Sequence, residues 1–156
     1  MDKKLKMEFC KALTKIGALK FGVFTLTSGK LSPYYIDLRL IPSFYNAFQL
    51  AIAIYESMAL KEIKLSEFDR IAGIPTAGIP FASVLSYRLK KPFLYVRKGI
   101  KTHGGERKVE GMLLPGNRVL IVDDLITTGK STLEAANSII AEGGKINDVL
   151  VLTDRQ

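Results

Sequence analysis

The pattern of apolar and polar positions divides the chain into two parts, and it changes at about Asp69. In the first part, apolar side chains recur at helical spacing up to about Leu19, which predicts an amphipathic N-terminal helix. The apolar positions of this helix are Leu5, Phe9, Leu13 and Ile16. Residues 21–39, rich in β-branched and aromatic side chains around a turn at 28–30, predict short strands, and a second helix is expected over 46–60.

From Asp69 onward, short apolar runs alternate with longer stretches of helical period. The expected strands cover 70–74, 93–96, 119–122 and 148–152, and the expected helices cover about 79–89 and 130–142. The runs at 119–122 and 149–152 are apolar at every position, which is typical of strands covered on both faces. We therefore predict an α/β fold with an open, mostly parallel sheet flanked by helices, and ligands bound beyond the carboxyl ends of its strands.

Length and composition limit the possible classes of protein. A chain of 156 residues, 47% of them apolar, fits one ordinary core, so we predict a single domain over 1–156. Within it we expect an N-terminal part over about 1–40 and a core over about 69–156. No apolar run reaches the length of about 18 residues needed for a membrane span, and we expect a cytoplasmic protein without membrane contact. The single cysteine, Cys10, excludes a disulfide within one chain and is given no role.

The net charge of +8 indicates an anionic partner, which could be nucleic acid, a membrane surface or a small molecule with several phosphates. Charge alone does not distinguish these partners. Its distribution is more informative, because cations gather in one stretch that contains glycines, His103 and a single acid, Glu106. The cations of this stretch are Arg97, Lys98, Lys101, Arg107 and Lys108.

Two adjacent acids and a loop of small residues follow the apolar run at 119–122. Asp123 and Asp124 come first, and the loop then leads through Gly129 to the expected start of a helix. Successive backbone N–H groups in such a loop, with the positive end of the helix dipole, form a cradle for a phosphate group. Carboxylates instead accept hydrogen bonds from ribose hydroxyls or hold a hydrated Mg²⁺. The segment therefore predicts that sugar and phosphate bind side by side.

The end of this loop, Gly129 to Ser131, imitates the end of a nucleotide-triphosphate P-loop. That motif requires a glycine five residues before its Gly-Lys pair. The residue at that position is Asp124, a charged side chain where the backbone would have to wrap a phosphate. The P-loop interpretation is therefore rejected.

Residues 122–131 resemble the motif with which type I phosphoribosyltransferases bind phosphoribosyl pyrophosphate (PRPP). In that family the two acids hold the ribose 2- and 3-hydroxyls, and the loop after them holds the 5-phosphate. The resemblance assigns these roles to Asp123 and Asp124, with Asp124 also expected to be catalytic, and to the loop. The loop residues expected to bind PRPP are Leu125, Ile126, Thr127, Thr128, Gly129, Lys130 and Ser131.

Three further segments narrow the resemblance to orotate phosphoribosyltransferases, which join orotate to the ribose of PRPP and release pyrophosphate. Residues 24–39 resemble the family's N-terminal hood over the base, and residues 73–80 resemble its pyrophosphate-binding loop. Many relatives carry a lysine where this chain has Thr27, and some carry an aromatic residue and a lysine near Thr76 and Ala77. Those side-chain roles do not transfer to this chain.

The third segment runs from Arg97 to Lys108, ending before Glu110 and Gly111, and resembles the mobile catalytic loop of the family. Its matches imply that Arg97, Lys98, Lys101 and His103 bind PRPP, and that Lys101 and His103 are catalytic. In the family this loop reaches over the active site of a neighbouring subunit. The resemblance therefore implies a homodimer with shared active sites.

The remaining expectations concern the base and the metal. The end of the chain, Asp154 to Gln156, resembles the segment whose arginine grips the orotate carboxylate, so Arg155 and Thr127 are expected to bind orotate. Mg²⁺ is expected as cofactor, held mainly by PRPP and reached by Asp123 and Asp124 through water, with no direct protein ligand.

Two alternatives stay open. The first is another PRPP-dependent phosphoribosyltransferase, acting on a purine or on uracil, against which Arg155 and the hood argue. The second is a PRPP-sensing regulator that uses the same fold to bind RNA or DNA. The sequence shows no basic platform interleaved with aromatic residues, so no nucleic-acid partner is expected.

Overall fold

The computed structural model describes residues 3–25, 29, 31–99 and 107–155. It divides into two compact units, Met1–Ile54 and Tyr55–Gln156. Three residues singled out from the sequence lie outside the described residues. Lys101 and His103 were expected to bind PRPP and to be catalytic, and Thr27 stands where many relatives carry a lysine. The expectation of a single domain over 1–156 stays a prediction.

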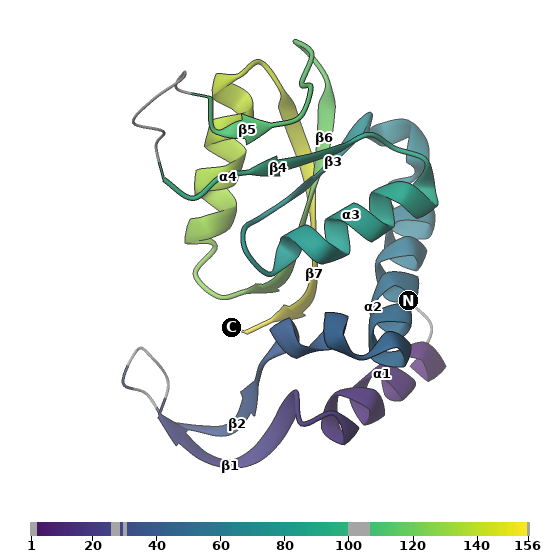
Figure 1. The fold of residues 1–156 in the computed structure, drawn as a ribbon, viewed down its shortest axis with the longest axis vertical. Helices are drawn as coiled ribbons and strands as arrows, with labels where there is room; N and C mark the ends of the chain where they lie inside the picture. Colours follow the sequence, from purple (N-terminus) through teal and green to yellow (C-terminus); the bar gives the residue numbers. More distant parts are fainter. Residues whose placement is uncertain (1–2, 26–28, 30, 100–106, 156) are drawn as a thin grey trace. The chain divides into compact units, whose positions relative to one another are not determined.

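The first unit holds a helix, a hairpin and the start of a second helix (Figure 1). Its elements are α1 (Lys3–Lys15), β1 (Leu19–Thr25), β2 (Leu31–Ile36), a 3₁₀ helix (Leu38–Ser43) and α2 (Tyr45–Met58). The spacing of apolar residues is confirmed in α1, which buries Phe9 and Leu13. The helix ends before the expected Leu19, since Gly17 adopts a left-handed φ of 71° and β1 then begins. The predicted short strands form an antiparallel hairpin.

The second unit is built on a five-stranded sheet with the order β5-β4-β3-β6-β7. Its strands are β3 (Arg70–Gly73), β4 (Phe93–Val96), β5 (Val109–Glu110), β6 (Arg118–Ile126) and β7 (Lys145–Asp154). Four strands are parallel and only the short β5 runs antiparallel to its neighbour, which confirms the predicted fold class. The sequence did not predict β5, because it follows directly on the basic, glycine-containing stretch.

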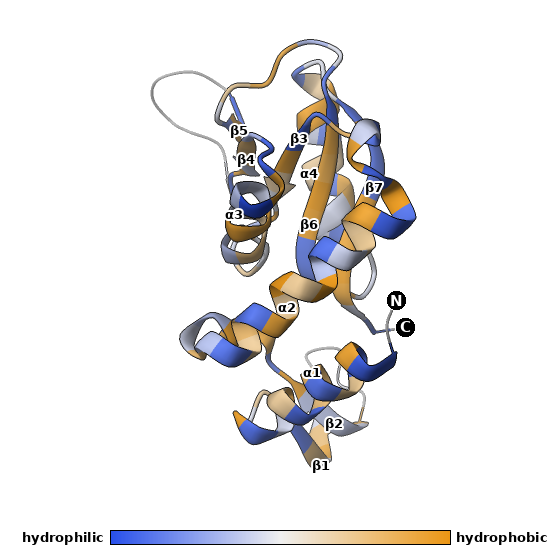
Figure 2. Ribbon diagram, turned by 90° about the vertical axis from the view of Figure 1, so that its right-hand side faces the viewer, coloured by the Kyte–Doolittle hydropathy of each residue, from blue (hydrophilic) through white to orange (hydrophobic). Residues whose placement is uncertain are grey.

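Helices α3 (Gly78–Leu89) and α4 (Lys130–Ala141) follow β3 and β6 respectively, within a residue or two of their expected positions. Val119 and Ile121 of β6 lie in one core cluster with Ala135 and Ile139 of α4. Leu120 and Val122 point to the opposite face by strand alternation and are equally buried. The strand is therefore covered on both faces, as its uninterrupted apolar run predicted, and Figure 2 shows that run in orange.

One boundary differs from expectation in a way that affects the site. The apolar run of β6 ends at Val122, but the strand itself continues to Ile126, because β7 keeps pairing with it as far as Asp154. The two acids therefore lie within the last part of the strand and not beyond it.

Among the residues that the structure describes, no helix combines the length and the apolar character required to cross a membrane.

Candidate active site at the end of β6

The two adjacent acids differ in their exposure. Asp123 is buried, with 7% of its surface exposed, whereas Asp124 is half-buried. The Asp123 carboxylate accepts a hydrogen bond from the Asp124 backbone N–H at 3.0 Å. This bond fixes the first carboxylate against the backbone of the second acid, so the pair forms one unit at the end of the strand.

Burial and the neighbouring charge change the acidity of this pair. Burial, followed by the negative charge of Asp124, raises the pKa of Asp123 to about 7, while the positive charge of Lys98 acts in the opposite direction. The pair therefore gains most from a ligand that supplies hydroxyl donors or positive charge, since either would stabilise two ionised carboxylates at close range. Ribose hydroxyls and hydrated cations both meet this requirement.

The turn from β3 to α3 is held close to the acids by two glycines. A Cβ on Gly78 would lie 2.6 Å from the Val122 carbonyl oxygen and 2.9 Å from the Asp123 Oδ1, and one on Gly73 would lie 2.9 Å from the Cα of Ile79. Only glycine allows backbone to approach this closely. The turn also contains a cis peptide bond between Pro75 and Thr76. The sequence marked this turn through its small residues, but it did not reveal that Gly78 contacts Asp123.

The loop between β6 and α4 forms a small pocket of about 70 Å³, lined by Asp123 and residues 125–132. Gly129 has a left-handed φ of 74° and precedes the first turn of α4, where it has no side chain with which to cap the helix. Of the first N–H groups of α4, that of Lys130 donates to the Thr128 hydroxyl at 3.4 Å, and Gly129 offers no side chain to cap the others. The structure thus gathers Asp123 and the predicted loop residues around one concavity that suits a phosphate group.

A second pocket, of about 170 Å³, lies where the β3–α3 turn, the end of β4 and the start of α4 meet. It brings Arg97 and Lys98 together with Pro75 of the turn and Ser131 of α4. Arg97 also forms an ion pair with Glu110 at 3.3 Å, which orients its guanidinium group. The end of β4 thus supplies positive charge close to the first turn of α4.

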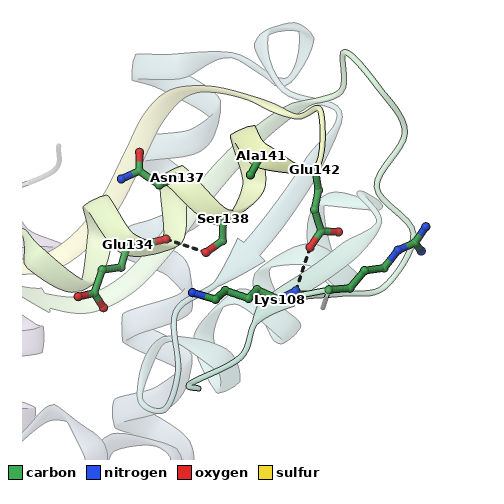
Figure 3. A pocket seen from close by; sticks show the side chains of 7 residues that line it. Lys108, Glu134, Asn137, Ser138, Ala141 and Glu142 are labelled. Atoms are coloured by element: carbon green, nitrogen blue, oxygen red, sulfur yellow. Dashed lines mark hydrogen bonds between the residues drawn. The ribbon is translucent and has the colours of Figure 1, made fainter. Parts of the chain in front are cut away.

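A third pocket, of about 650 Å³, lies elsewhere, along α4 (Figure 3). Lys108, Glu134, Asn137, Ser138 and Glu142 line it, and neither acid of the pair does. The Glu142 carboxylate accepts hydrogen bonds from the backbone N–H groups of Lys108 at 2.9 Å and Val109 at 3.0 Å. These bonds attach the start of β5 to the end of α4. Size alone therefore does not make this groove the candidate site, because it lacks the acids and the phosphate cradle.

Comparison with known proteins agrees with the site's chemistry. The phosphoribosyl transferase domain matches residues 45–156. An orotate phosphoribosyltransferase from Pyrobaculum aerophilum is 48% identical over 93% of this chain and 73% of its own length. Another from Sulfolobus acidocaldarius is 43% identical over 96% of this chain and 74% of its own length.

The chain belongs to the orotate phosphoribosyltransferase family.

A solved member of the family has the same fold. The orotate phosphoribosyltransferase of Aeropyrum pernix superposes with a TM-score of 0.82 at 35% identity, over 94% of this chain and 81% of that chain. The expectation from the sequence motifs is thus confirmed for family and fold. The comparisons do not test the roles of individual residues, which stay predictions.

Within the orotate phosphoribosyltransferase fold, Arg155 lies at the end of β7, next to the acid strand. Its backbone N–H donates to the Ile126 carbonyl at 2.9 Å, so the end of β7 is held beside the start of the cradle. Thr127, the other residue expected to contact orotate, directly follows Ile126. The structure therefore brings both orotate-binding candidates to the same end of the sheet, while the loop candidates Lys101 and His103 lie outside its described part.

The acid pair also meets the requirements of an indirectly bound Mg²⁺. In the described ranges no cluster of three or more His, Cys, Asp or Glu side chains could hold a metal ion. Mg²⁺ keeps several waters and is commonly bound through one or two carboxylates and the phosphates of a substrate. Asp123 and Asp124 supply two carboxylates beside a phosphate cradle, so the donor set fits a metal carried by PRPP.

Proposed function

We propose that this chain transfers the 5-phosphoribosyl group of PRPP to orotate, giving orotidine 5′-phosphate and pyrophosphate in pyrimidine (UMP) biosynthesis. Membership in the orotate phosphoribosyltransferase family supports the reaction. At the level of residues, one observation carries the proposal. Asp123 and the loop of residues 125–132 line the same concavity. Few ligands other than a phosphorylated sugar need carboxylates and a phosphate cradle side by side.

The acids and the cradle divide the substrate between them. Asp123 and Asp124 accept hydrogen bonds from the ribose 2- and 3-hydroxyls, and the cradle of residues 127–131 binds the 5-phosphate through its backbone N–H groups. Ile74 and Pro75 of the β3–α3 turn line the second pocket together with the end of β4, where Arg97 and Lys98 provide charge for pyrophosphate. PRPP is thus held at both ends, which leaves its C1 carbon between the two anionic groups.

The reaction breaks the bond between C1 and pyrophosphate while a ring nitrogen of orotate bonds to C1, through a transition state with oxocarbenium character. Negative charge grows on the departing pyrophosphate. Arg97, Lys98, Lys101 and His103 stabilise that charge electrostatically. Mg²⁺ bound to the phosphates of PRPP would neutralise part of the same charge. The attacking ring nitrogen loses its proton as the new bond forms, and the departing pyrophosphate, whose negative charge is growing, can accept it.

Arg155 and Thr127 contribute to recognition of the base. A guanidinium group forms two parallel hydrogen bonds with a carboxylate, which orotate has and uracil lacks. The backbone bond from Arg155 to Ile126 supports this assignment, since it keeps Arg155 beside the strand that carries the acids.

The proposal extends to the assembly and its surroundings. We infer a cytoplasmic homodimer in which the catalytic loop of each subunit serves the site of the other, with neither nucleic acid nor membrane as a partner. The family resemblance of residues 97–108 supports the shared site, and the segment gathers several of the cations behind the net charge of +8. Positive charge is thus concentrated where a polyphosphate substrate needs it.

The reaction is tested by measuring pyrophosphate release from PRPP and Mg²⁺ with orotate, uracil, adenine or hypoxanthine as the acceptor. We expect release with orotate and at least about 100-fold less with each other base, because they lack the carboxylate that Arg155 binds. Faster release with a purine or with uracil would assign the chain to another base. No release with any base, together with tight binding of RNA or DNA that weakens with salt, would favour the regulator.

A further inference from the structure

Tyr55 joins α2 to the strand that carries the acids. Its side chain is fully buried, at 0% exposure, and its hydroxyl donates a hydrogen bond to the backbone carbonyl of Asp123. The ring also contacts Phe81 of α3, with ring centroids 5.8 Å apart. Tyr55 thus reaches the first acid through its backbone, while Gly78 of α3 approaches the carboxylate of the same residue.

The acids lie on a stretch of β6 that has lost one of its two neighbouring strands. The pairing of β3 with β6 ends at Gly73 and Val122, whereas the pairing with β7 continues to the end of β6. Val122 directs its carbonyl to β3, where it accepts from the Ile74 N–H at 3.2 Å, so strand alternation turns the Asp123 carbonyl toward β7. Tyr55 therefore reaches the backbone on its β7 side, next to the point where β3 stops pairing with β6.

A buried hydroxyl at this position needs a reason, because a phenylalanine would fill nearly the same space without a polar group to satisfy. Burial, and then the charges of Asp124 and Asp123, raise the pKa of Tyr55 well above its usual value, while hydrogen bonding by the Leu152 backbone lowers it. Tyr55 thus stays protonated across the physiological range and remains a donor to Asp123. The hydrogen bond from Tyr55 to Asp123 is therefore present whether or not the carboxyl groups of Asp123 and Asp124 are ionised.

We propose that Tyr55 is a positioning residue for PRPP binding, which fixes the backbone of Asp123 and Asp124 so that both carboxylates meet the ribose hydroxyls. This inference rests on the proposed function, since it assumes that the acids bind the ribose. Tyr55 does not touch the substrate and acts only through the strand. Its loss should therefore affect recognition of PRPP and leave recognition of orotate nearly unchanged.

The test compares Tyr55→Phe with Ser86→Ala in the 156-residue chain. Ser86 is a matched control, because it is also buried and its hydroxyl also donates to a backbone carbonyl, that of Lys91, at the far end of α3. Both variants lose one buried hydrogen bond, and both should unfold at somewhat lower urea concentration than the wild type. Only Tyr55→Phe should raise the KM and the calorimetric Kd for PRPP, by about three- to tenfold, with the KM for orotate within about twofold.

Each outcome decides the inference. Equal KM values for PRPP in Tyr55→Phe, Ser86→Ala and the wild type would overturn it, as would a parallel rise in both KM values of Tyr55→Phe. Should Tyr55→Phe fail to fold, Phe81→Leu replaces it, because it loosens the ring while keeping the hydroxyl; an unchanged KM for PRPP would then overturn the inference. A wild type without orotate turnover would refute the proposed function separately, while PRPP binding by calorimetry would still test Tyr55.

Discussion

Asp123 combines two properties that oppose each other, a buried position and a role that requires charge. Asp123 is 7% exposed and its carboxyl pKa is about 7. Near neutral pH, this carboxyl group is therefore protonated in a fraction of the unliganded molecules. A carboxyl group whose pKa is higher in the folded than in the unfolded chain stabilises the fold most when it is protonated. That contribution is complete below about pH 4 and is lost as the pH rises toward 7.

The first prediction follows from this sign. The amide side chain in the Asp123→Asn variant cannot ionise, but it still offers an oxygen to the Asp124 N–H. At pH 8 the free energy of unfolding of this variant should therefore exceed that of the wild type by about 1–3 kcal/mol. The full pKa shift would correspond to a larger free-energy difference. Residual solvent around Asp123 and sharing of the proton with Asp124 reduce it to this range. Urea unfolding at pH 8 and pH 5 measures it, and the difference should shrink at pH 5. A variant that is no more stable than the wild type at pH 8 would contradict the account.

At this scale the sequence identified the residues with distinctive chemistry and missed those whose role depends on distance. Asp123, Asp124 and the cradle stand together in the sequence, so a motif could mark them. Tyr55 lies far from Asp123 along the chain, and nothing in its surroundings distinguishes it from an ordinary core aromatic residue. Such a contact becomes visible only when helix and strand have been placed in space.

At the scale of elements, the β3–α3 turn sets how closely a helix approaches the acid strand. Gly78 is the first residue of α3, and the space that its Cβ would need is occupied by the Val122 carbonyl and the Asp123 carboxylate. Replacing glycine by alanine in a helix is ordinarily stabilising by roughly 1 kcal/mol. Here the close contact with backbone atoms, which cannot move aside easily, should reverse the sign.

The second prediction is that Gly78→Ala lowers the free energy of unfolding by about 1–3 kcal/mol and weakens PRPP binding as well. Ser83→Ala is the matched control, since Ser83 is an exposed residue of the same helix and its replacement should change stability by less than about 0.5 kcal/mol. Urea unfolding and calorimetric titration with PRPP measure the two effects. A Gly78→Ala variant as stable as the wild type would show that α3 can shift without cost.

Most elements could be predicted because the helical period of 3.6 and the short uninterrupted apolar runs of the strands are both clear in this chain. The extension of β6 to Ile126 could not, since Asp123 and Asp124 interrupt the apolar run and only pairing with β7 keeps these residues extended. The two-residue strand β5 was missed for a related reason, because its residues gain strand geometry by pairing with β4 rather than through a pattern of their own.

At the scale of the whole molecule, the proposed homodimer implies that complete active sites need two subunits. If the loop acts across a dimer, Lys101 and Asp124 of each site come from different chains. With PRPP well below its KM, Lys101→Ala and Asp124→Asn should each retain only a small part of the wild-type activity, but a hybrid dimer would contain one intact site and one doubly damaged site. This arrangement makes the shared site measurable without a structure of the dimer.

The third prediction is that mixing equal amounts of these two variants restores about a quarter of the wild-type activity. With free exchange, about half of the dimers are hybrids, and each hybrid has one of its two sites intact. Orotate-dependent pyrophosphate release measures the recovery, and mass spectrometry of the intact dimers confirms the exchange. Absence of recovery despite confirmed exchange would place loop and cradle within one chain.

Binding of PRPP by the acids at the end of β6 and by the cradle after them is the basis of the proposed function. It is tested most directly by calorimetric titration with PRPP and Mg²⁺ of three proteins: the wild type, Asp124→Asn and the control Asp148→Asn, which makes the same chemical change elsewhere, on β7. We predict that Asp124→Asn weakens binding by about 1–3 kcal/mol, since it loses a charge-assisted hydrogen bond, while Asp148→Asn binds like the wild type. Wild-type affinity in Asp124→Asn, or an equal loss in both variants, would contradict the assignment of this site.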